Sequence, residues 1–119
     1  MDLQQLRDRC RRRTGAAEGH PFGPGALVMK VGGKTFAIIA EDDEPLSISL
    51  KCEPDLALEL RRSYAAVQPG YHLNKRHWNT VTLDGTVPDR QIGEWIDDSY
   101  DLVWEGLPLR VREGIDPRT

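Results

Sequence analysis

The residues best suited to bind a ligand lie between Pro69 and Leu83, in the run P-G-Y-H-L-N-K-R-H-W-N-T-V-T-L. Two histidines, a lysine, an arginine, an asparagine and a tryptophan stand just before a strand-like segment. No aspartate or glutamate occurs between Glu59 and Asp84, so this part of the chain is locally positive although the net charge is -3. Holding such side chains in an ordered loop costs conformational entropy, which indicates a binding surface.

We predict that this surface binds nucleic acid weakly, through the Tyr71–Trp78 loop and one face of a sheet. Cations would contact phosphates, Trp78 would stack on a base, and the asparagine and histidines would form hydrogen bonds. The candidate residues are Lys30, Lys51, Arg61, Arg62, His72, Asn74, Lys75, Arg76, His77 and Trp78. With three or four phosphates engaged, log affinity would fall against log salt with a slope of roughly -3.

The same residues also fit structural roles. Arg61 and Arg62 could satisfy the C-terminal carbonyls of a helix, and Trp78 could belong to the core. The histidines and Asn74 could then fix the backbone of their own loop. The five arginines near the N-terminus (Arg7, Arg9, Arg11, Arg12 and Arg13) are a second basic patch, which is more typical of a solvated helix face than of a docking site.

Two other functions stay open. A pocket where the Phe22 linker meets the His72–Trp78 loop could hold a small anionic or aromatic ligand, or the chain could be a protein-interaction module. Catalysis is not expected, because no phosphate loop, dinucleotide-binding or zinc-hydrolase motif occurs. No base lies near Ser99 in the sequence, and Cys10 and Cys52 are expected to be buried and unactivated. Neither a metal nor a cofactor is expected, since His72 and His77 are five residues apart and lack paired cysteines.

Length and composition predict a single domain over residues 1–119, with 114–119 as a frayed tail. The longest apolar run, Phe36–Ala40, is far too short to cross a membrane, and no basic-then-apolar leader opens the chain. We therefore expect a cytoplasmic protein, monomeric or weakly dimeric, with two structural cysteines.

The apolar pattern predicts alternating helices and strands. Asp2 and Gln5 form a capping-box pattern at the start of a helix that ends near Gly15. A linker to about Pro24 follows, in which Phe22 is expected to enter the core. Gly32-Gly33 then predicts a tight hairpin between strands over Ala26–Val31 and Lys34–Ala40.

Further elements follow from the same reasoning. Leu46–Cys52 alternates apolar and polar residues, which predicts a strand with one wet face. A helix from Pro54 would turn Leu56, Leu60 and Tyr64 inward. A strand over Asn79–Leu83 would turn Thr80 and Thr82 outward, and a last helix would begin at Pro88. The fold class is α+β: a two-layer domain with an antiparallel sheet and helices on one face.

The sequence also resembles the small bacterial MmcQ/YjbR family over nearly its whole length. The resemblance is carried by the run from His72 to Val81, H-L-N-K-R-H-W-N-T-V, followed by Leu83-Asp84-Gly85, together with the shorter matches His20–Gly23, Gly33–Ala37, Leu50-Lys51, Ser99-Tyr100 and Leu107-Pro108. It implies a CyaY-like (frataxin-like) α+β fold and a DNA-binding role, the latter by likeness to a double-wing DNA-binding fold.

Overall fold

A computed structural model describes residues 1–118 of the chain. Its strands are β1 (Ala17–Gly19), β2 (Ala26–Val31), β3 (Lys34–Ala40), β4 (Ser47–Lys51), β5 (Val67–Pro69) and β6 (Trp78–Thr82). Its helices are α1 (Leu3–Arg11), α2 (Pro54–Ser63), α3 (Asp89–Glu105) and α4 (Leu109–Ile115). Neighbouring strands pair antiparallel in one sheet, in the order β1-β2-β3-β4-β6-β5.

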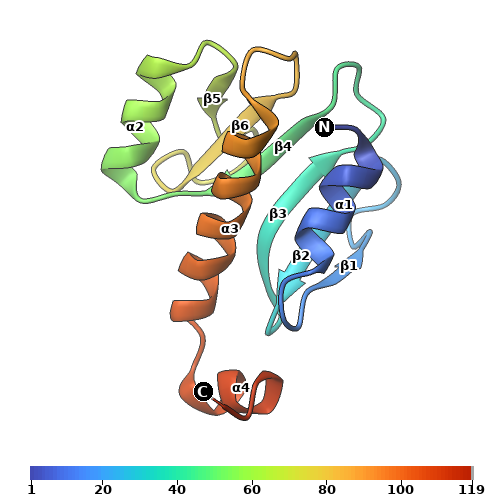
Figure 1. The fold of residues 1–119 in the computed structure, drawn as a ribbon, viewed down its shortest axis with the longest axis vertical. Helices are drawn as coiled ribbons and strands as arrows, with labels where there is room; N and C mark the ends of the chain where they lie inside the picture. Colours follow the sequence, from blue (N-terminus) through green and yellow to red (C-terminus); the bar gives the residue numbers. More distant parts are fainter. Residues whose placement is uncertain (119) are drawn as a thin grey trace.

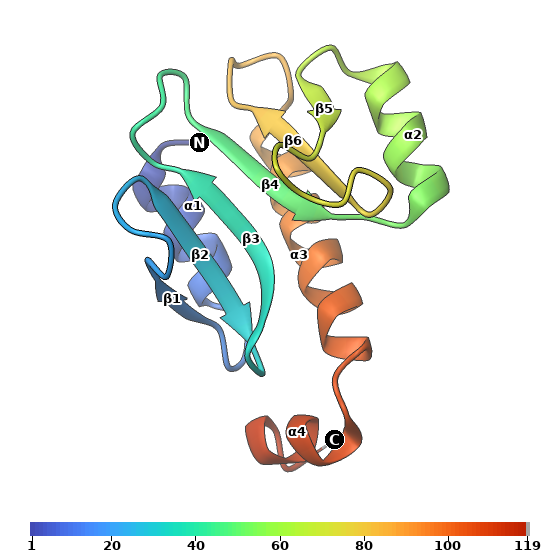
Figure 2. The same cartoon turned by 180° about the vertical axis from the view of Figure 1, so that it is seen from behind.

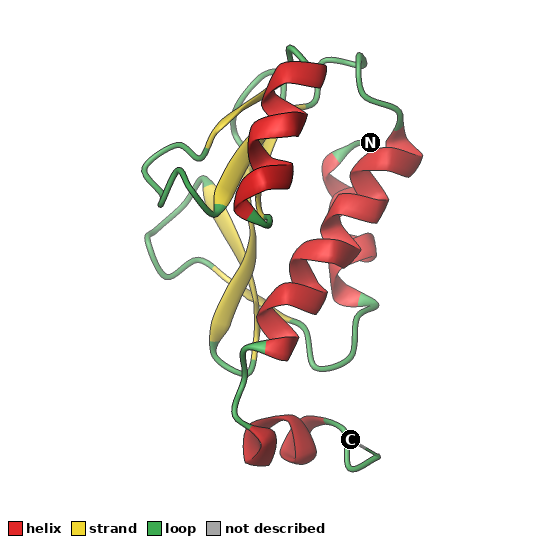
Figure 3. Cartoon of the chain, turned by 90° about the vertical axis from the view of Figure 1, so that its left-hand side faces the viewer, coloured by secondary structure: helices red, strands yellow, loops and turns green. Residues whose placement is uncertain are grey.

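The helices α1, α2 and α3 lie against one face of the sheet, and the other face carries only loops (Figures 1 and 3). The predicted two-layer α+β class is therefore confirmed. Helix α4 lies beyond the C-terminal end of α3 (Figure 1). No helix within residues 1–118 combines the length and apolar character needed to span a bilayer.

Local signals in the sequence account for two of these elements. The side chain of Asp2 accepts a hydrogen bond from the Gln5 backbone, and Gln5 accepts one from the Asp2 backbone, each at 2.8 Å. The predicted capping box at α1 is thus present. Gly32 and Gly33 have φ of 57° and 80°, in the left-handed region that a tight hairpin requires and that glycine adopts most readily.

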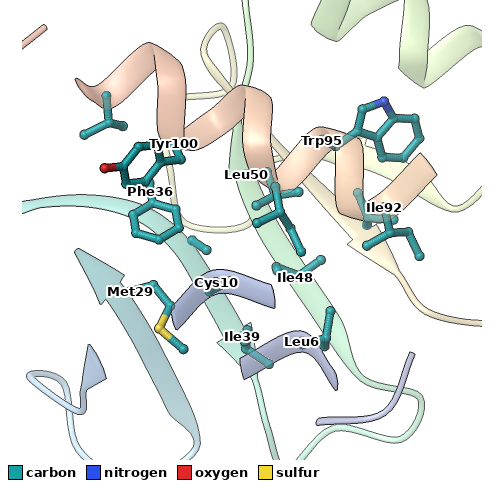
Figure 4. Packing of buried hydrophobic residues seen from close by; sticks show 14 of the residues in the cluster. Leu6, Cys10, Met29, Phe36, Ile39, Ile48, Leu50, Ile92, Trp95 and Tyr100 are labelled. Carbon is teal, nitrogen blue, oxygen red and sulfur yellow. The ribbon is translucent and has the colours of Figure 1, made fainter. Parts of the chain in front are cut away.

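The core lies between the sheet and the helices, as Figure 4 shows for its central residues. Leu6 and Cys10 of α1 pack with Ile39 and Ile48 of the sheet, and all four side chains are fully buried. Phe36 of β3 makes an edge-to-face contact with Tyr100 of α3 at 5.3 Å between ring centroids. Burial of a side chain such as Ile or Phe contributes roughly 1.5–3 kcal/mol to folding.

Strands β3 and β4 separate at one end, and α3 closes the gap (Figure 2). Their pairing runs from Ala37–Leu50 to Ala40–Ser47 and stops there, because Phe36 lies in a bulge opposite β2. The buried Ser99 hydroxyl donates to the Phe36 carbonyl at 2.6 Å and accepts from the Lys51 N–H at 2.8 Å. One side chain of α3 therefore replaces the missing ladder bond between two strands.

Three elements were not predicted from the sequence: β1, β5 and α4. Strand β1 adds three residues at the edge of β2, and α4 follows α3 after a short turn. Gly114 and Ile115, which were predicted to begin a frayed tail, lie in α4. Ile115 packs against the core and touches the position where Gly15 would carry a side chain. Thr119, the end of the predicted tail, lies outside the described residues.

Two predicted core contacts are wrong. Phe22 is 78% exposed, because it projects from an irregular segment whose Gly23 and Gly25 both turn through the left-handed region. Leu56 is 43% exposed, and its neighbour Ala57 is the residue of α2 that is buried. The small Ala57 lets α2 approach β6, where the Asn79 side-chain amide donates to the Ala57 carbonyl.

Candidate functional site

The open face of the sheet has a floor of small and hydroxyl side chains. In the strand register, Ile38, Ser49 and Thr80 lie side by side across β3, β4 and β6, and Ala40, Ser47 and Thr82 form the next row. The Ser49 and Thr80 hydroxyls share a hydrogen bond of 2.7 Å. The prediction that Thr80 and Thr82 lie on the open face is consistent with this register.

Three loops surround this floor and enclose a hollow of about 840 Å³, which we call the open-face groove. Its walls include Phe22, Asp43, Pro45, Tyr71 and His72. Phe22 and Tyr71 are 78% and 73% exposed, so two aromatic side chains border the same hollow in contact with solvent. This is the place where the sequence suggested a pocket, between the Phe22 linker and the loop that begins at Tyr71.

The 70–77 loop is held by its own hydrogen bonds. The Tyr71 N–H donates to the Thr80 hydroxyl at 3.0 Å, which ties the loop to the floor of the groove. The Lys75 ammonium donates to the Gly70 carbonyl at 2.9 Å, and the Asn74 side chain accepts from the Arg76 N–H at 2.9 Å. His72 has φ of 57°, which is unusual for a residue with a side chain and positions its ring 4.0 Å from that of Tyr71.

Arg61 supports the same loop from the helix side. Its Nε donates to the Asn79 side-chain oxygen at 2.7 Å, and its Nη2 donates to the carbonyls of Lys75 and Trp78. Arg61 is a residue of α2, whereas Asn79 and Trp78 belong to β6. The guanidinium thus joins three segments, through hydrogen bonds from its Nε and Nη2 atoms.

The structure brings together only some of the predicted nucleic-acid residues. His72, Asn74, Lys75, Arg76, His77 and Trp78 share one loop and the start of β6, and Lys51 is the register partner of Trp78. Asn74, Arg76 and His72 are exposed, whereas His77 and Trp78 are half-buried.

The remaining cations lie elsewhere. Lys30 is on β2, two strands from Lys51, and lines a separate shallow hollow beside β1. Arg62 is exposed on α2 and lies 3.7 Å from Glu59. Arg61 and Lys75 donate to backbone carbonyls, which hold their side chains in place without neutralising their charge. Lys51, Arg62 and Arg76 are the predicted cations near the loop that have no such carbonyl partner among the described residues.

The arginines of α1 are largely neutralised by carboxylates. Arg9 bonds Asp97 at 2.6 Å, and Arg13 bonds Asp101 at 2.7 Å while its guanidinium covers the Tyr100 ring. Arg7 bonds Glu18 at 2.7 Å, and the pKa of Glu18 is lowered mainly by that hydrogen bond. The second basic patch therefore joins α1 to α3 and β1.

The cysteine thiols and Ser99 are poorly placed to act as nucleophiles. Burial raises the pKa of the Cys10 thiol to about 12, and burial together with the carboxylates of Asp98 and Glu53 raises that of the half-buried Cys52. Ser99 has both of its hydrogen bonds inside the fold. Among residues 1–118 there is no group of three or more His, Cys, Asp or Glu side chains that could hold a metal ion.

Sequence reasoning missed the aromatic wall formed by Phe22 and the part played by the 43–45 turn. Phe22 was assigned to the core because a phenylalanine is usually buried. The pattern Pro21-Phe22-Gly23 was a usable signal, since a residue between two turn formers often projects outward.

The class of protein is thus a two-layer α+β domain in which, among the described residues, one sheet face is bordered by loops and not covered by helices. The YjbR family model matches residues 12–102, and the chain belongs to this family. The chain is 37% identical to the uncharacterized protein YjbR of Escherichia coli (strain K12), over 95% of this chain and 96% of that one. It is 36% identical to the uncharacterized protein YbdF of Escherichia coli O157:H7, over 82% of this chain and 80% of that one.

Solved structures agree with this assignment. A crystal structure of a Deinococcus radiodurans protein superimposes with a TM-score of 0.90 at 39% identity, covering 96% of this chain and 87% of that one. A crystal structure of a Pseudomonas syringae protein gives a TM-score of 0.74 at 30% identity, covering 86% and 98%. The predicted family membership is confirmed.

Proposed function

We propose that this protein is a binding protein whose open-face groove holds a flat, uncharged ring with hydrogen-bonding edges, of the nucleobase type. The observation that carries the proposal is the pair of exposed aromatic side chains, Phe22 and Tyr71, beside a floor of serine and threonine hydroxyls. Aromatic walls provide stacking, and hydroxyls serve as both donors and acceptors toward a ring edge.

The charge of the groove favours a neutral ligand over an anionic one. Among the described lining residues there is no lysine or arginine, and the ionisable groups are Asp43, His72 and the Tyr71 phenol. A phosphate placed on this floor would find a carboxylate nearby and no permanent cation. The ring itself, rather than a phosphate attached to it, is therefore expected to supply most of the affinity.

Binding of adenosine, cytidine, guanosine and thymidine, measured by thermal shift and by amide chemical shifts, tests the proposal. At one hundred times Kd a ligand adds about 2.7 kcal/mol of stability, which raises Tm by about 10 °C in a domain of this size. Phe22→Ala and Tyr71→Ala should each weaken binding about tenfold or more, since stacking on one aromatic contributes about 1–3 kcal/mol.

Leu109→Ala is the matched control, because Leu109 is also an exposed apolar residue and lies outside the groove. It should leave binding unchanged. If none of the four nucleosides binds at millimolar concentration, or if both aromatic variants bind as the parent does, the proposal is wrong.

Nucleic acid is the second candidate, and the exposed Arg76 on the same loop as Tyr71 favours it. Arg62 lies on α2 beside Glu59, so two phosphates, at Lys51 and Arg76, would be engaged rather than three or four. The expected slope of log affinity against log salt is then about -2 on duplex and about -1.4 on single strands. Anisotropy with labelled oligonucleotides measures it, and Arg76→Ala combined with Lys51→Ala should abolish it while Lys34→Ala should not.

We include in the proposal that binding involves no covalent step and that the protein works in the cytoplasm. The free, weakly acidic thiols of Cys10 and Cys52 are consistent with both parts. A bound nucleoside should be recovered chemically unchanged after incubation, which chromatography checks. Conversion of the nucleoside to a new product would refute the proposal that binding involves no covalent step.

A further inference from the structure

A second cavity, of about 260 Å³, lies on the opposite side of the sheet from the open-face groove. It lies between α2 and α3, over β4 and β6, and we call it the helix-side cavity. Its apolar walls are Leu50, Leu56, Leu60, Val81, Trp95 and Leu102. The Trp95 indole lies at the α2 end of the core, apart from the Phe36–Tyr100 pair, and contacts Tyr64 edge-to-face at 5.1 Å (Figure 4).

This cavity is open to solvent along an apolar wall. Leu56 is 43% exposed although it lines the cavity, so α2 and α3 do not close over it. The volume suits one ring system or a short alkyl group, and it is too small for a helix of a partner protein. An apolar hollow that stays open to water is a place where a small ligand gains affinity by displacing solvent.

The rim of the cavity is strongly acidic. Four carboxylates border it, from Glu53, Asp98, Asp101 and Glu105, and the single cationic residue there is Lys51. Asp101 is bonded to Arg13, but within residues 1–118 Asp98 has no hydrogen-bond or ion-pair partner. Cys52, Glu53 and Asp98 all line the cavity, and the two carboxylates help to raise the pKa of the Cys52 thiol.

Among the described residues, negative charge gathers around Asp98 without a cation beside it. The pKa of Asp98 is raised by burial and by the neighbouring carboxylates of Asp101, Asp97 and Glu94. A cation beside Asp98 would relieve this repulsion, whereas a phosphate or carboxylate would add to it. Charge and shape therefore select the same kind of molecule.

We propose that the helix-side cavity binds a small organic cation with an apolar body. The apolar part lies between Leu56, Leu60 and Trp95, and the ammonium group lies at the rim beside Asp98 and Glu53. A ring seated beside the Trp95 indole also gains aromatic contact. This site is distinct from the open-face groove, and either could be occupied without the other.

Calorimetry with three probes of the same shape tests the proposal: 1-naphthylmethylamine, 1-naphthylmethanol and 1-naphthoate. The amine should bind best, the alcohol about fivefold to tenfold more weakly, and the carboxylate not measurably. Amide shifts should fall on α2, α3 and β6 residues of the cavity. Equal binding of amine and alcohol, or shifts confined to the open-face groove, would overturn it.

Substitutions at the rim test whether its negative charge is responsible for binding of the amine. Asp98→Asn combined with Glu53→Gln should weaken the amine about tenfold and leave the alcohol unchanged. Glu59→Gln is the control, because it removes an exposed carboxylate from α2 that neither lines the cavity nor acts on Asp98. If the double variant and Glu59→Gln change the affinity for the amine equally, the assignment of the rim is wrong. Both variants alter exposed residues, so each is expected to fold.

Discussion

Arg61 and Arg62 are adjacent in sequence, carry the same charge and have contrasting surroundings, which makes them a sharp test of the loop's support. Arg61 bonds the Asn79 side chain at 2.7 Å and two backbone carbonyls, whereas Arg62 is exposed and has one contact at 3.7 Å to Glu59. Replacing each arginine by methionine keeps the aliphatic stem and removes the donors. We expect Arg61→Met to destabilise the protein by about 3 kcal/mol.

The magnitude follows from the bonds that are lost. A hydrogen bond from a charged donor contributes about 1.5–3 kcal/mol, and the buried Asn79 oxygen would be left without its partner at a cost of about 1–3 kcal/mol. Partial solvent access to Arg61 reduces the sum, so about 3 kcal/mol is a central value. In a domain of this size that lowers Tm by about 12 °C.

Urea unfolding and thermal melting of the two variants measure the difference directly. Arg62→Met should change the free energy of unfolding by less than about 0.5 kcal/mol, as is typical of an exposed ion pair. Amide exchange should become faster in the 70–77 loop of Arg61→Met and stay unchanged in Arg62→Met. Similar, small effects of the two substitutions would refute the role assigned to Arg61.

Three further predictions concern stability. Gly32→Ala should cost about 2 kcal/mol or more in urea unfolding, and Gly33→Ala distinctly less. Both have positive φ, but a Cβ at Gly32 meets Leu107 at 2.7 Å while one at Gly33 meets nothing; equal losses would contradict this. Ser99→Ala should cost about 2–3 kcal/mol, because it orphans the Phe36 carbonyl and the Lys51 N–H; a loss below 1 kcal/mol would argue against the bridge. In the folded protein the pKa of the Cys10 thiol is raised to about 12, so its contribution to the free energy of unfolding is complete below about pH 9 and is lost as pH rises toward 12. Cys10→Ala should therefore make the free energy of unfolding fall less steeply with pH in that window. An unchanged slope of free energy against pH would contradict this prediction.

Most of the fold could be predicted because its signals are local. The capping box at Asp2, the Gly32-Gly33 turn and the alternation from Leu46 to Cys52 each depend on residues close in sequence. Strand β1 and helix α4 carry no comparable pattern. Each is stabilised by a neighbour that is distant in the chain: Lys30 and Val28 pair with β1, and Gly15 accommodates Ile115 of α4.

The position of the 70–77 loop could be predicted, but the partners of its side chains could not. The pattern at 69–83 correctly located a loop beside an open sheet face, because strand parity is a local property. It did not reveal that Arg61 would turn toward the loop's carbonyls and that Lys75 would bond Gly70. Whether a cation is free depends on tertiary partners, and the spacing of charges along a sequence contains no such information.

Net charge is a poor guide to what this protein binds, because most of the arginines near the N-terminus are paired with carboxylates. Arg7, Arg9 and Arg13 are paired with acids of β1 and α3, so neither sign contributes much to the field around α1. The charged side chains that line the two hollows differ between the two faces of the sheet. Successive residues of β6 point to opposite faces. Asn79 and Val81 line the helix-side cavity, which has apolar walls and an acidic rim, whereas Thr80 and Thr82 line the nearly uncharged open-face groove. A polyanion would be repelled on one side and find no permanent cation on the floor of the other, so any nucleic acid must bind at the edge, near Arg76.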